Sequence, residues 1–423
     1  MAERDYDVVV FGATSVTGRR VAAYLAGLGD ASGGPSWAAA GRDLARVEHV
    51  LAKEGVGAPA LLAADVVDPE SLRAMAASAR TVVNLVGPYT RYGEPVIEAC
   101  VEGGAHYVDL TGEIPFARRM LDRFDAAARE AGVKIVQTCG FESLPPDLLT
   151  ALAAEAARER FSENLREVEL ETFVTRFPSG IPRPSDLLSG GTMQSMVEVT
   201  GDRDAVRVTD PGALLPDPAT ADAVRTTSPI RVAPRRGSNG TVIAPMAPAA
   251  FINPAVIHRS AAILADDAGE EFRPFAYREG IAIGGSPATL PLRYAAAGAL
   301  SAVQAGMARA TRATPATRGR LSSGMRRVFP DAGFGPGSDR LADWGWAMRV
   351  QGRTGSGKSV AAAVDADGHP GYLATARMMG EAGLLLAEPG ATPDRAGCLT
   401  PATALGTGVV ERFARAGLRF SVD

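Results

Sequence analysis

The segment VVVFGATSVTG, residues 8–18, constrains what this chain can fold into more than any other stretch. Its apolar run at residues 8–11 is typical of a buried parallel strand. The run leads into a turn of small residues and then into a predicted helix at residues 18–28. Backbone amides in such a turn can approach a pyrophosphate at the helix N-terminus. The segment therefore predicts the start of a dinucleotide-binding unit, with cofactor contacts at Gly12, Thr14, Ser15, Thr17 and Gly18.

The spacing of this turn departs from the dinucleotide-binding pattern at one place. Gly12 and Gly18 take the first and last positions of a G-x-x-G-x-x-G spacing, and Ser15 replaces the middle glycine. A serine hydroxyl can still donate a hydrogen bond. Because the turn stands at the start of an α/β pattern, nucleotide binding is favoured over an ordinary strand-to-helix connection.

Strand and helix patterns alternate through the first third of the chain. Apolar runs typical of strands occur at residues 8–11, 37–40, 60–64, 81–86, 106–110 and 134–138. Helical patterns separate most of them, at residues 18–28, 44–54, 69–78, 94–103 and 115–131. Such alternation builds a parallel sheet. We therefore predict an α/β fold with a Rossmann-type, doubly wound parallel sheet in residues 1–145, the dinucleotide-binding domain.

The pattern changes after Pro145 and Pro146. An alanine-rich helix is predicted at residues 147–160, and residues 167–175 alternate as a half-exposed antiparallel strand does. Residues 177–254 are rich in Pro and Gly and are expected to form either a lid over the substrate or a surface loop. A final set of elements comprises strands at residues 272–283, 347–351 and 360–365 and a helix at 372–387. Residues 146–369 thus predict a second, α+β domain with a mainly antiparallel sheet, serving substrate binding or oligomerisation.

Composition narrows the class of protein. The chain has 46% apolar and 22% charged residues, a net charge of −4 and no run of Lys or Arg, so nucleic acid is not an expected partner. Three widely spaced cysteines without C-x-x-C spacing exclude a disulfide framework and fit a reducing cytoplasm. No signal-peptide core or transmembrane segment is expected. The alanine-rich stretch 295–310 is too short to span a bilayer, so a buried or interfacial helix and possible homodimer contact are expected there.

Residues 352–359, GRTGSGKS, match the phosphate-loop pattern of ATPases. That motif requires a buried strand before it and a helix after it. Here the flanking sequences, WAMRVQ and SVAAAVDADG, both have the composition of strands. The segment therefore predicts the turn of a β-hairpin and no nucleoside triphosphate site.

The end of the second predicted strand indicates which nicotinamide cofactor binds. An NAD-specific site usually has an acidic residue there to accept from the ribose 2′-hydroxyl, but this chain has AAAGR at residues 38–42. The Arg42 guanidinium can pair with a 2′-phosphate, which favours NADP(H), although the neighbouring Asp43 leaves NAD open. Asp65 follows the third strand and is expected either to contact the adenine or to cap the helix near Pro69.

Two further loops are predicted at the carboxyl edge of the sheet, where ligands bind in open α/β folds. The fourth strand leads into Asn84 and Gly87, which should border the nicotinamide, and then into Tyr89 and Tyr92. Each tyrosine could donate a proton or hydrogen bond to a substrate carbonyl, or simply pack. Residues 139–147, CGFESLPPD, could form the opposite wall of the crevice or an interdomain turn.

Other chemistry has little support in the sequence. The four histidines are scattered, without metal-ligand spacing, so no metal site is expected. No G-x-S-x-G nucleophile elbow is present. Cys139 ends a predicted buried strand, where a packing role is expected in place of a nucleophilic one.

Taken together, these segments resemble the saccharopine dehydrogenase-like NADP-binding family, and within it the trans-acting enoyl reductases. The first residues that carry the resemblance are FGATSVTG at 11–18, AGR at 40–42, NLVGPYTRYGEPVIEACVEGGAHYVDLTGE at 84–113 and CGFESLPPD at 139–147. Later blocks are SGGT at 189–192, APMAPAAFINPAVIHRS at 244–260, PGYLATARMMGEAGLLLA at 370–387 and LTPATALG at 399–406. The family usually has glycine in place of Ser15 and aspartate in place of Glu142.

The resemblance implies that NADPH reduces an electron-poor C=C bond in an α,β-unsaturated acyl or polyketide-type substrate, free or carrier-bound, in lipid or polyketide biosynthesis. Such a reaction needs a hydrogen-bond donor at the carbonyl oxygen and a proton source for the α-carbon. Tyr89 and Tyr92 are the candidates, and residues 253–260 with Arg259 are candidates for substrate or carrier contact. The resemblance also implies that the helix in residues 370–423 returns to pack on the first domain.

Two other functions stay open at this point. A saccharopine dehydrogenase-like amino-acid oxidoreductase would need a cationic cluster for substrate carboxylates, and Arg235 with Arg236 is the only adjacent arginine pair in the predicted Pro/Gly-rich segment. A non-catalytic NADP-binding scaffold would have its crevice filled by side chains. An apolar pocket beside the nicotinamide favours the enoyl reductase.

Overall fold

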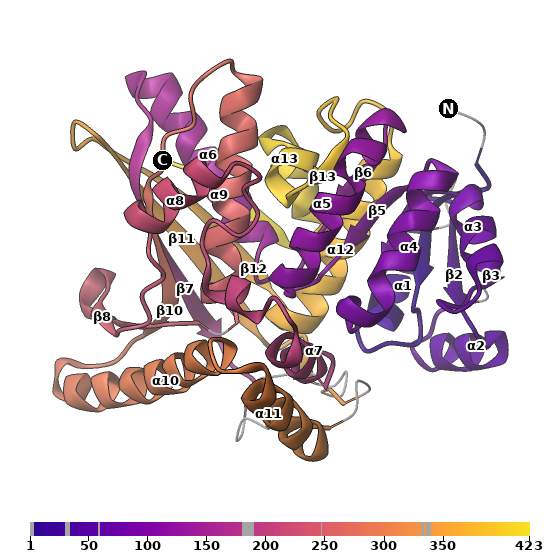
Figure 1. The fold of residues 1–423 in the computed structure, drawn as a ribbon, viewed down its shortest axis with the longest axis horizontal. Helices are drawn as coiled ribbons and strands as arrows, with labels where there is room; N and C mark the ends of the chain where they lie inside the picture. Colours follow the sequence, from indigo (N-terminus) through magenta and orange to yellow (C-terminus); the bar gives the residue numbers. More distant parts are fainter. Residues whose placement is uncertain are drawn as a thin grey trace.

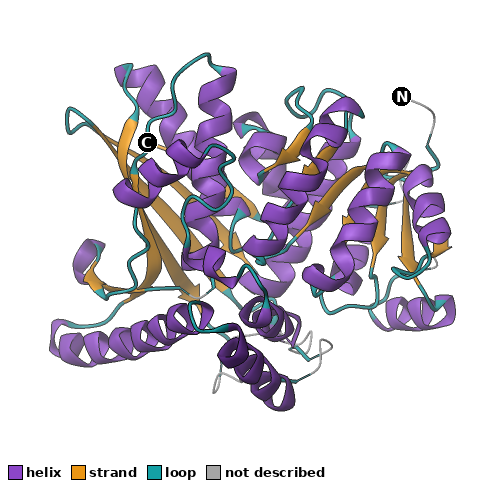
Figure 2. Ribbon diagram, viewed as in Figure 1, coloured by secondary structure: helices purple, strands orange, loops and turns teal. Residues whose placement is uncertain are grey.

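The computed structural model describes residues 4–29, 34–57, 60–179, 190–246, 248–330, 334–335 and 340–423. Within these ranges the chain forms two seven-stranded sheets, sheet A and sheet B, at opposite ends of the molecule, each with helices packed against it (Figures 1 and 2). Sheet A is built mainly from the first third of the chain and sheet B from the remainder. The predicted α/β class, with one parallel sheet and a second, mainly antiparallel one, is confirmed.

Sheet A is parallel throughout and has the order β13-β6-β5-β4-β1-β2-β3. Its strands are β1 (Tyr6–Phe11), β2 (Trp37–Gly41), β3 (Ala60–Ala63), β4 (Ala79–Asn84), β5 (His106–Asp109), β6 (Lys134–Val136) and β13 (Gly397–Leu399). The strand order reverses between β1 and β4, as in a doubly wound sheet, and a crevice for ligands forms at such a point. The sequence did not predict β13, which comes from the C-terminal region and pairs with β6.

Helices bury both faces of sheet A because side chains alternate along each strand. In β1, Val8 and Val10 pack in one apolar cluster with α1, α2 and α12, whereas Val9 and Phe11 pack in another with α3, α4 and α5. The bounds are α1 (Gly18–Gly27), α2 (Leu44–Lys53), α3 (Pro69–Ser78), α4 (Tyr89–Gly103), α5 (Ile114–Glu130) and α12 (Thr375–Ala387).

Sheet B has the order β14-β12-β11-β7-β10-β9-β8. Only the pairing of β7 with β10 is parallel among the pairs of this sheet in the described residues. Its strands are β7 (Leu165–Arg176), β8 (Arg235–Arg236), β9 (Val242–Ala244), β10 (Ala276–Ile283), β11 (Gly345–Thr354), β12 (Ser359–Asp367) and β14 (Leu418–Val422).

The phosphate-loop look-alike is the turn of the β11–β12 hairpin, as predicted. Gly352 pairs with Val360 in the antiparallel ladder. Lys358, which would hold a phosphate in an ATPase, lies 3.1 Å from the carboxylate of Glu163 instead. No helix follows the turn, so the segment lacks the helix N-terminus that a phosphate site needs.

The remaining helices cover sheet B and the space between the sheets. They are α6 (Leu144–Phe161), α7 (Gly190–Gly201), α8 (Pro218–Thr227), α9 (Ala249–Asp267), α10 (Leu290–Thr311), α11 (Pro315–Val328) and α13 (Pro401–Leu405), with short helical turns η2 (Ala205–Thr209), η3 (Ser238–Gly240), η4 (Pro287–Thr289), η6 (Pro370–Ala374) and η7 (Thr407–Ala416). One apolar cluster runs from β1 through α12 and α6 to β11 and β12, so the two sheets share a core. The predicted domain boundary at residue 145 lies at the start of α6 and stays a prediction.

Three predicted elements differ from the structure. The fourth helix begins at Tyr89, five residues before the predicted start, because a carboxylate distant in sequence caps it. The segment 177–254, expected to be irregular, contains α7, η2, α8, β8 and β9, while its residues 180–189 and 247 lie outside the described part. The helix expected to be buried or interfacial at 295–310 is the longer α10, most of whose outer side is exposed.

Candidate cofactor and substrate site

A cavity of about 490 Å³ lies at the carboxyl ends of the central strands of sheet A. Its floor is made by the loops after β1, β4, β5 and β6, which contribute residues from the groups 12–17, 85–89, 110–114 and 138–143. Its cover consists of α7, η2, the start of α9 and the last turn of α10. This is the switch-point position where doubly wound folds bind their ligands.

The turn between β1 and α1 brings the backbone close to the cavity floor at its glycines. Gly12 has φ +86°, and a Cβ added there would lie 2.9 Å from the carbonyl carbon of Leu85. A Cβ at Gly18 would lie 2.2 Å from the Gly12 carbonyl oxygen. The Gly18 amide donates to Ser15 Oγ at 2.9 Å, so serine closes this turn where glycine was expected. With Thr14, Ser15 and Thr17 lining the cavity, the turn fits the pyrophosphate of a dinucleotide.

The residues after β2 fit a 2′-phosphate better than a free 2′-hydroxyl. Arg42 is exposed, lines the cavity and makes no hydrogen bond or ion pair with the described residues. The neighbouring Asp43 is committed elsewhere, because its carboxylate caps α2 by accepting from the Arg46 amide at 3.0 Å. An Arg42 guanidinium that can pair with a 2′-phosphate, beside an Asp43 carboxylate that already caps a helix, is the arrangement expected for NADP(H).

Four predicted site residues do not line the cavity: Gly18, Asp65, Asn84 and Tyr92. The Asp65 carboxylate accepts from the Val67 amide at 3.2 Å, and the cap of α3 is Asp68, not Asp65. Asn84 is fully buried, and its amide donates to the Tyr107 hydroxyl at 3.0 Å while its oxygen accepts from the Val86 amide at 3.0 Å. Asn84 therefore shapes the loop that carries Gly87, which does line the cavity.

The two tyrosines proposed for catalysis lie in the first turn of α4. Tyr89 lines the cavity but is only 4% exposed, and its hydroxyl donates to the Asn84 carbonyl at 3.1 Å. Burial raises the pKa of Tyr89 well above its usual value, so the hydroxyl is protonated. Tyr92 is half-buried and does not line the cavity. Their catalytic roles stay predictions.

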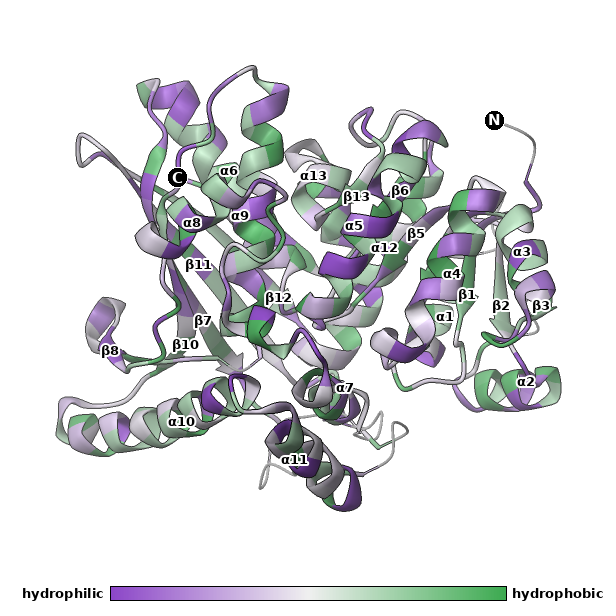
Figure 3. Ribbon diagram, viewed as in Figure 1, coloured by the Kyte–Doolittle hydropathy of each residue, from purple (hydrophilic) through white to green (hydrophobic). Residues whose placement is uncertain are grey.

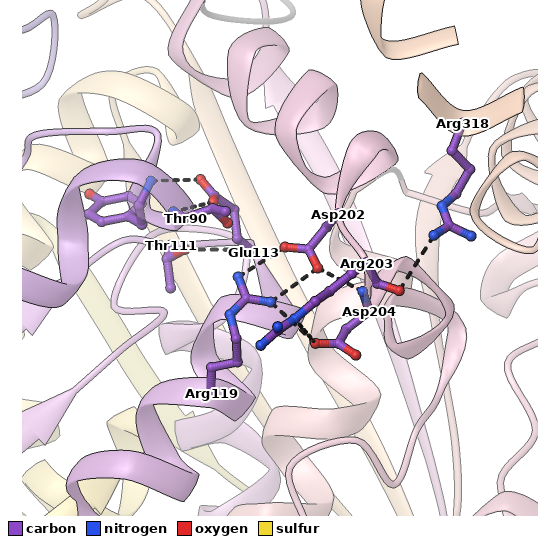
Figure 4. Close-up of polar contacts among 9 residues, drawn as sticks. Thr90, Thr111, Glu113, Arg119, Asp202, Arg203, Asp204 and Arg318 are labelled. Atoms are coloured by element: carbon purple, nitrogen blue, oxygen red, sulfur yellow. Dashed lines mark hydrogen bonds and ion pairs between the residues drawn. The ribbon is translucent and has the colours of Figure 1, made fainter. Parts of the chain in front are cut away.

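Glu113 is hydrogen-bonded both to the floor and to the cover of the cavity. Its buried carboxylate accepts from the amides of Tyr89 at 3.0 Å and Thr90 at 2.7 Å, the first turn of α4 (Figure 4). The same carboxylate accepts from the Ser195 hydroxyl of α7 at 2.7 Å. An anion stabilises a helix N-terminus, which explains why α4 starts as early as Tyr89. Sequence reasoning missed this role because the partners lie 24 and 82 residues from Glu113.

Glu142 is the carboxyl group of the second wall. It lines the cavity, and burial raises the pKa of its side chain. Its backbone carbonyl accepts from the Asn253 amide at 2.7 Å, and the hydroxyl of Ser143 donates to Asn253 Oδ1 at 2.7 Å. Asn253 in turn donates to Glu279 at 2.7 Å. The loop that presents Glu142 is thereby fixed from behind by α9 and β10.

The segment 253–260, predicted to contact substrate or carrier, supports the site from outside it. Asn253 is fully buried behind the Glu142 loop, and Arg259 is buried away from the cavity lining. Ser260 donates to the buried Asp147. These residues hold α9 against α6.

The cover is held to sheet A by a cluster of charged groups. Arg119 of α5 makes a bidentate pair with Asp202, at 3.0 and 2.9 Å, and lies 3.5 Å from Asp204 (Figure 4). Arg118 donates to the carbonyls of Ala213 and Leu215. These contacts place η2 and the end of α7 over the cavity.

The inner surface of the cavity is mostly apolar. Its charged lining residues, within the described ranges, are Arg42 at the cofactor turn and the carboxyl groups of Glu113 and Glu142. The cover contributes the apolar side chains of Met196, Val199, Val208, Ile252 and Met307. Among the described residues, the lining opposite the cofactor turn thus suits an apolar acyl group and includes no cation for a carboxylate.

Other candidate centres are structural. Cys139 is fully buried, and burial raises the pKa of its thiol well above the usual value, so it is protonated. Burial lowers the pKa of His258 to about 3 and that of His106 to about 4, so both rings are neutral. In the part of the chain that is described, no group of three His, Cys, Asp or Glu side chains could hold a metal ion. Nor does any described helix have the length and apolarity needed to cross a membrane.

Residues 8–136 match the family model of the saccharopine dehydrogenase NADP-binding domain. A Mycobacterium tuberculosis protein bearing the trans-acting enoyl reductase name is 36% identical over 98% of this chain and 97% of its own length. The trans-acting enoyl reductase of Mycobacterium leprae is 32% identical, with the same coverage. Apo saccharopine dehydrogenase (L-Glu forming) from Saccharomyces cerevisiae shares the fold, with a TM-score of 0.52, 15% identity, and coverage of 98% of this chain and 99% of that one.

Proposed function

The chain belongs to the trans-acting enoyl reductase family, and from that premise we propose that it reduces the C=C bond of an α,β-unsaturated acyl thioester held by another protein. It is an NADP-dependent oxidoreductase, with an NADP-binding domain in residues 8–136. The observation that carries the proposal is the cavity itself, which joins a dinucleotide turn to an apolar chamber whose described lining has no cationic cluster.

This chain's own residues provide a place for each part of the cofactor. The turn at Gly12, Ser15 and Gly18 would hold the pyrophosphate, and Arg42 would pair with the 2′-phosphate. When bound, NADPH supplies a hydride for the β-carbon of the substrate. The apolar side chains of the cover exclude water from that end of the cavity.

Reduction also requires a proton at the α-carbon, and we assign its source to Glu142. The side chain lines the cavity, and its raised pKa keeps a share of it protonated where an ordinary glutamate is ionised. Giving up that proton leaves the carboxylate, which takes another from solvent after product leaves. Tyr89 and Tyr92 remain the proposed donors to the acyl oxygen, but Tyr89 must first give up its bond to the Asn84 carbonyl.

The two alternative functions lack support from the cavity. An amino-acid oxidoreductase needs cations for substrate carboxylates, but Arg235 pairs with Glu169 at 2.6 Å and does not line the cavity. A non-catalytic scaffold with a filled crevice does not account for a chamber of about 490 Å³ beside the cofactor turn.

The test is a titration of the purified protein with NADPH and with NADH, followed by nicotinamide fluorescence. Arg42→Ala is expected to weaken NADPH binding at least about tenfold, the loss of one charge-assisted phosphate contact, and to leave NADH binding unchanged. Arg46→Ala, an exposed arginine one helical turn further along, is the matched control. Wild-type protein should then oxidise NADPH when crotonyl-pantetheine is added.

Two outcomes would overturn the proposal. Failure of both nucleotides to bind would exclude the reductase and favour a scaffold. Binding of NADPH without oxidation by any enoyl thioester, but with turnover of an amino acid and a keto acid, would favour the amino-acid oxidoreductase.

A further inference from the structure

The helices α10 and α11 form a surface whose charge differs from that of the chain as a whole. Residues 281–330 contain seven arginines and no Asp, Glu or Lys, although the net charge of the whole protein is −4. Five of these arginines are exposed and make up what we call the basic face: Arg309, Arg312, Arg320, Arg326 and Arg327. In Figure 3, strongly hydrophilic segments alternate along α11, whereas α10 is pale or hydrophobic over most of its length.

The positive charge of the basic face is largely unneutralised. Arg309, Arg320 and Arg327 make no hydrogen bond or ion pair with the described residues. Arg312 donates only to the Thr209 hydroxyl, at 3.3 Å. Arg326 shares one carboxylate, that of Glu198, with Arg91. By contrast, Arg119 of α5 is matched by an acid, Asp202, at the end of α7.

The basic face adjoins the cavity. The last turn of α10 lines the cavity through Met307, Ala308 and Thr311, between and beside Arg309 and Arg312. Thr209, the partner of Arg312, also lines it. The helix α11 packs on the outer side of α7, where Ser322 donates to the Val197 carbonyl at 3.0 Å. The cavity-lining residues of α7 and η2 are partly exposed, whereas most of those on the floor after β5 and β6 are buried.

We propose that the basic face of α10 and α11 is the docking surface for an acidic carrier domain, which delivers its thioester-linked acyl group into the cavity beside it. This inference rests on the proposed function, since it assigns the partner that presents the substrate. The proposed function does not include the place where the partner binds, which here is the basic face of α10 and α11.

Charge complementarity supports this occupant. A carrier holds its acyl group on a phosphopantetheine arm, whose phosphodiester is an anion between the carrier surface and the thioester. Arginine binds phosphate through paired N–H groups, and all seven cations of this segment are arginines. An acidic domain would also be steered toward a positive surface on an otherwise acidic protein.

A lipid surface fits these helices less well. Interfacial helices combine basic residues with large aromatic and aliphatic side chains on one amphipathic element. Here α10 keeps its apolar and basic residues in separate parts, because all its exposed large apolar side chains precede its first exposed arginine, Arg309. These apolar side chains are Leu290, Leu292, Tyr294, Leu300 and Val303. On α11 the unpaired Arg320 and Arg327 are seven residues apart and so share one face of the helix. Its exposed large apolar residues are Leu321 and Val328, and none of its residues is aromatic.

The experiment compares one enoyl group on two supports. Crotonyl-pantetheine and crotonyl loaded on a purified acidic bacterial acyl carrier protein are reduced by wild-type protein and by the triple variant Arg309→Glu, Arg320→Glu, Arg327→Glu. The matched control is the triple variant Arg160→Glu, Arg278→Glu, Arg353→Glu, on α6, β10 and the β11 hairpin. These three arginines are exposed, make no hydrogen bond or ion pair with the described residues and lie outside the cavity lining. Binding of the fluorescently labelled holo-carrier is measured in parallel by anisotropy, which needs no turnover.

We expect the basic-face variant to raise KM for the crotonyl carrier at least about tenfold and to weaken carrier binding equally, while kcat/KM for crotonyl-pantetheine changes less than about twofold. The control should behave as wild type, and wild-type carrier binding should weaken as salt rises. Equal carrier binding by the variant and wild type would overturn the inference. The inference would also be overturned if the basic-face variant lost the cosedimentation with phosphatidylglycerol vesicles that wild type shows and bound the carrier as wild type does. That result would assign the basic face to lipid. Absence of turnover of both substrates, with intact salt-sensitive carrier binding, would instead contradict the proposed function alone.

Discussion

The floor and the cover of the cavity are specified in different ways. The floor is held by backbone geometry within short stretches, such as the turn from Gly12 to Gly18, where added side chains would collide with the chain itself. The cover is held by side chains from distant positions, such as Arg119 with Asp202 and Glu113 with Ser195. The floor, which binds the cofactor, is therefore fixed by residues close together in the sequence. The cover, which faces the substrate, is attached through a few polar contacts between distant residues.

The largest effect should come from breaking the floor at Gly18. A Cβ in Gly18→Ala would lie 2.2 Å from the Gly12 carbonyl, so the turn must open. We expect NADPH affinity to fall more than about 100-fold, the equivalent of roughly 3 kcal/mol. Gly27→Ala, in the same helix but with open space at the added Cβ, should bind NADPH as wild type does.

Ser15→Ala tests the same turn if Gly18→Ala does not fold. It removes only the acceptor of the Gly18 amide, so about a tenfold loss of affinity with an unchanged melting temperature is expected. Normal NADPH binding by both variants would show that the turn is not the cofactor site.

An intermediate effect should come from Glu142, on the floor but facing the substrate. Glu142→Gln keeps the shape of the side chain and removes the acidic proton, so kcat should fall about 100-fold while NADPH affinity is retained. The wild-type rate should fall as pH rises through the pKa of Glu142, because only the protonated form donates and burial has shifted that pKa upward. Steady-state rates across the pH range check both expectations.

Glu142→Asp serves as the control for this assignment. It retains the acid with a shorter reach, so it should keep part of the rate and all of the pH dependence. A Glu142→Gln variant that kept both the rate and the pH profile of the wild type would transfer the role to another group, with Tyr89→Phe and Tyr92→Phe as the next variants.

The smallest effect should come from loosening the cover. Asp202→Asn removes the charge that pairs with Arg119, with about 1–2 kcal/mol less stability because the pair is only partly buried. We expect KM for crotonyl-pantetheine to rise about fivefold while NADPH affinity stays the same. Asp122→Asn, which breaks the exposed pair with Arg118, should change neither quantity. A parallel loss of NADPH affinity in Asp202→Asn would show that floor and cover are not separable.

The same contrast explains how far the sequence alone could predict the molecule. The strands of sheet A and the cofactor turn follow from local apolar runs and glycine spacing, and so does the hairpin at residues 352–359. Seven predicted site residues line one cavity: Gly12, Thr14, Ser15, Thr17, Arg42, Gly87 and Tyr89. The early start of α4 could not be predicted, because Glu113 caps it from the far side of β5. The helix α7 was missed because its apolar and glycine residues have no strong period of their own, and its position depends on partners such as Ser322.

The strand β13 has a consequence for the order in which the protein is made. It completes the edge of sheet A beside β6, and α12 covers the face of β1 and β4, yet both are translated after all but the last strand of sheet B. During synthesis the part of this apolar face that α12 covers, beside α1 and α2, therefore stays exposed while more than half of the chain emerges from the ribosome. A fragment ending near residue 145 would lack α12 and β13 and would leave that part of the face exposed permanently.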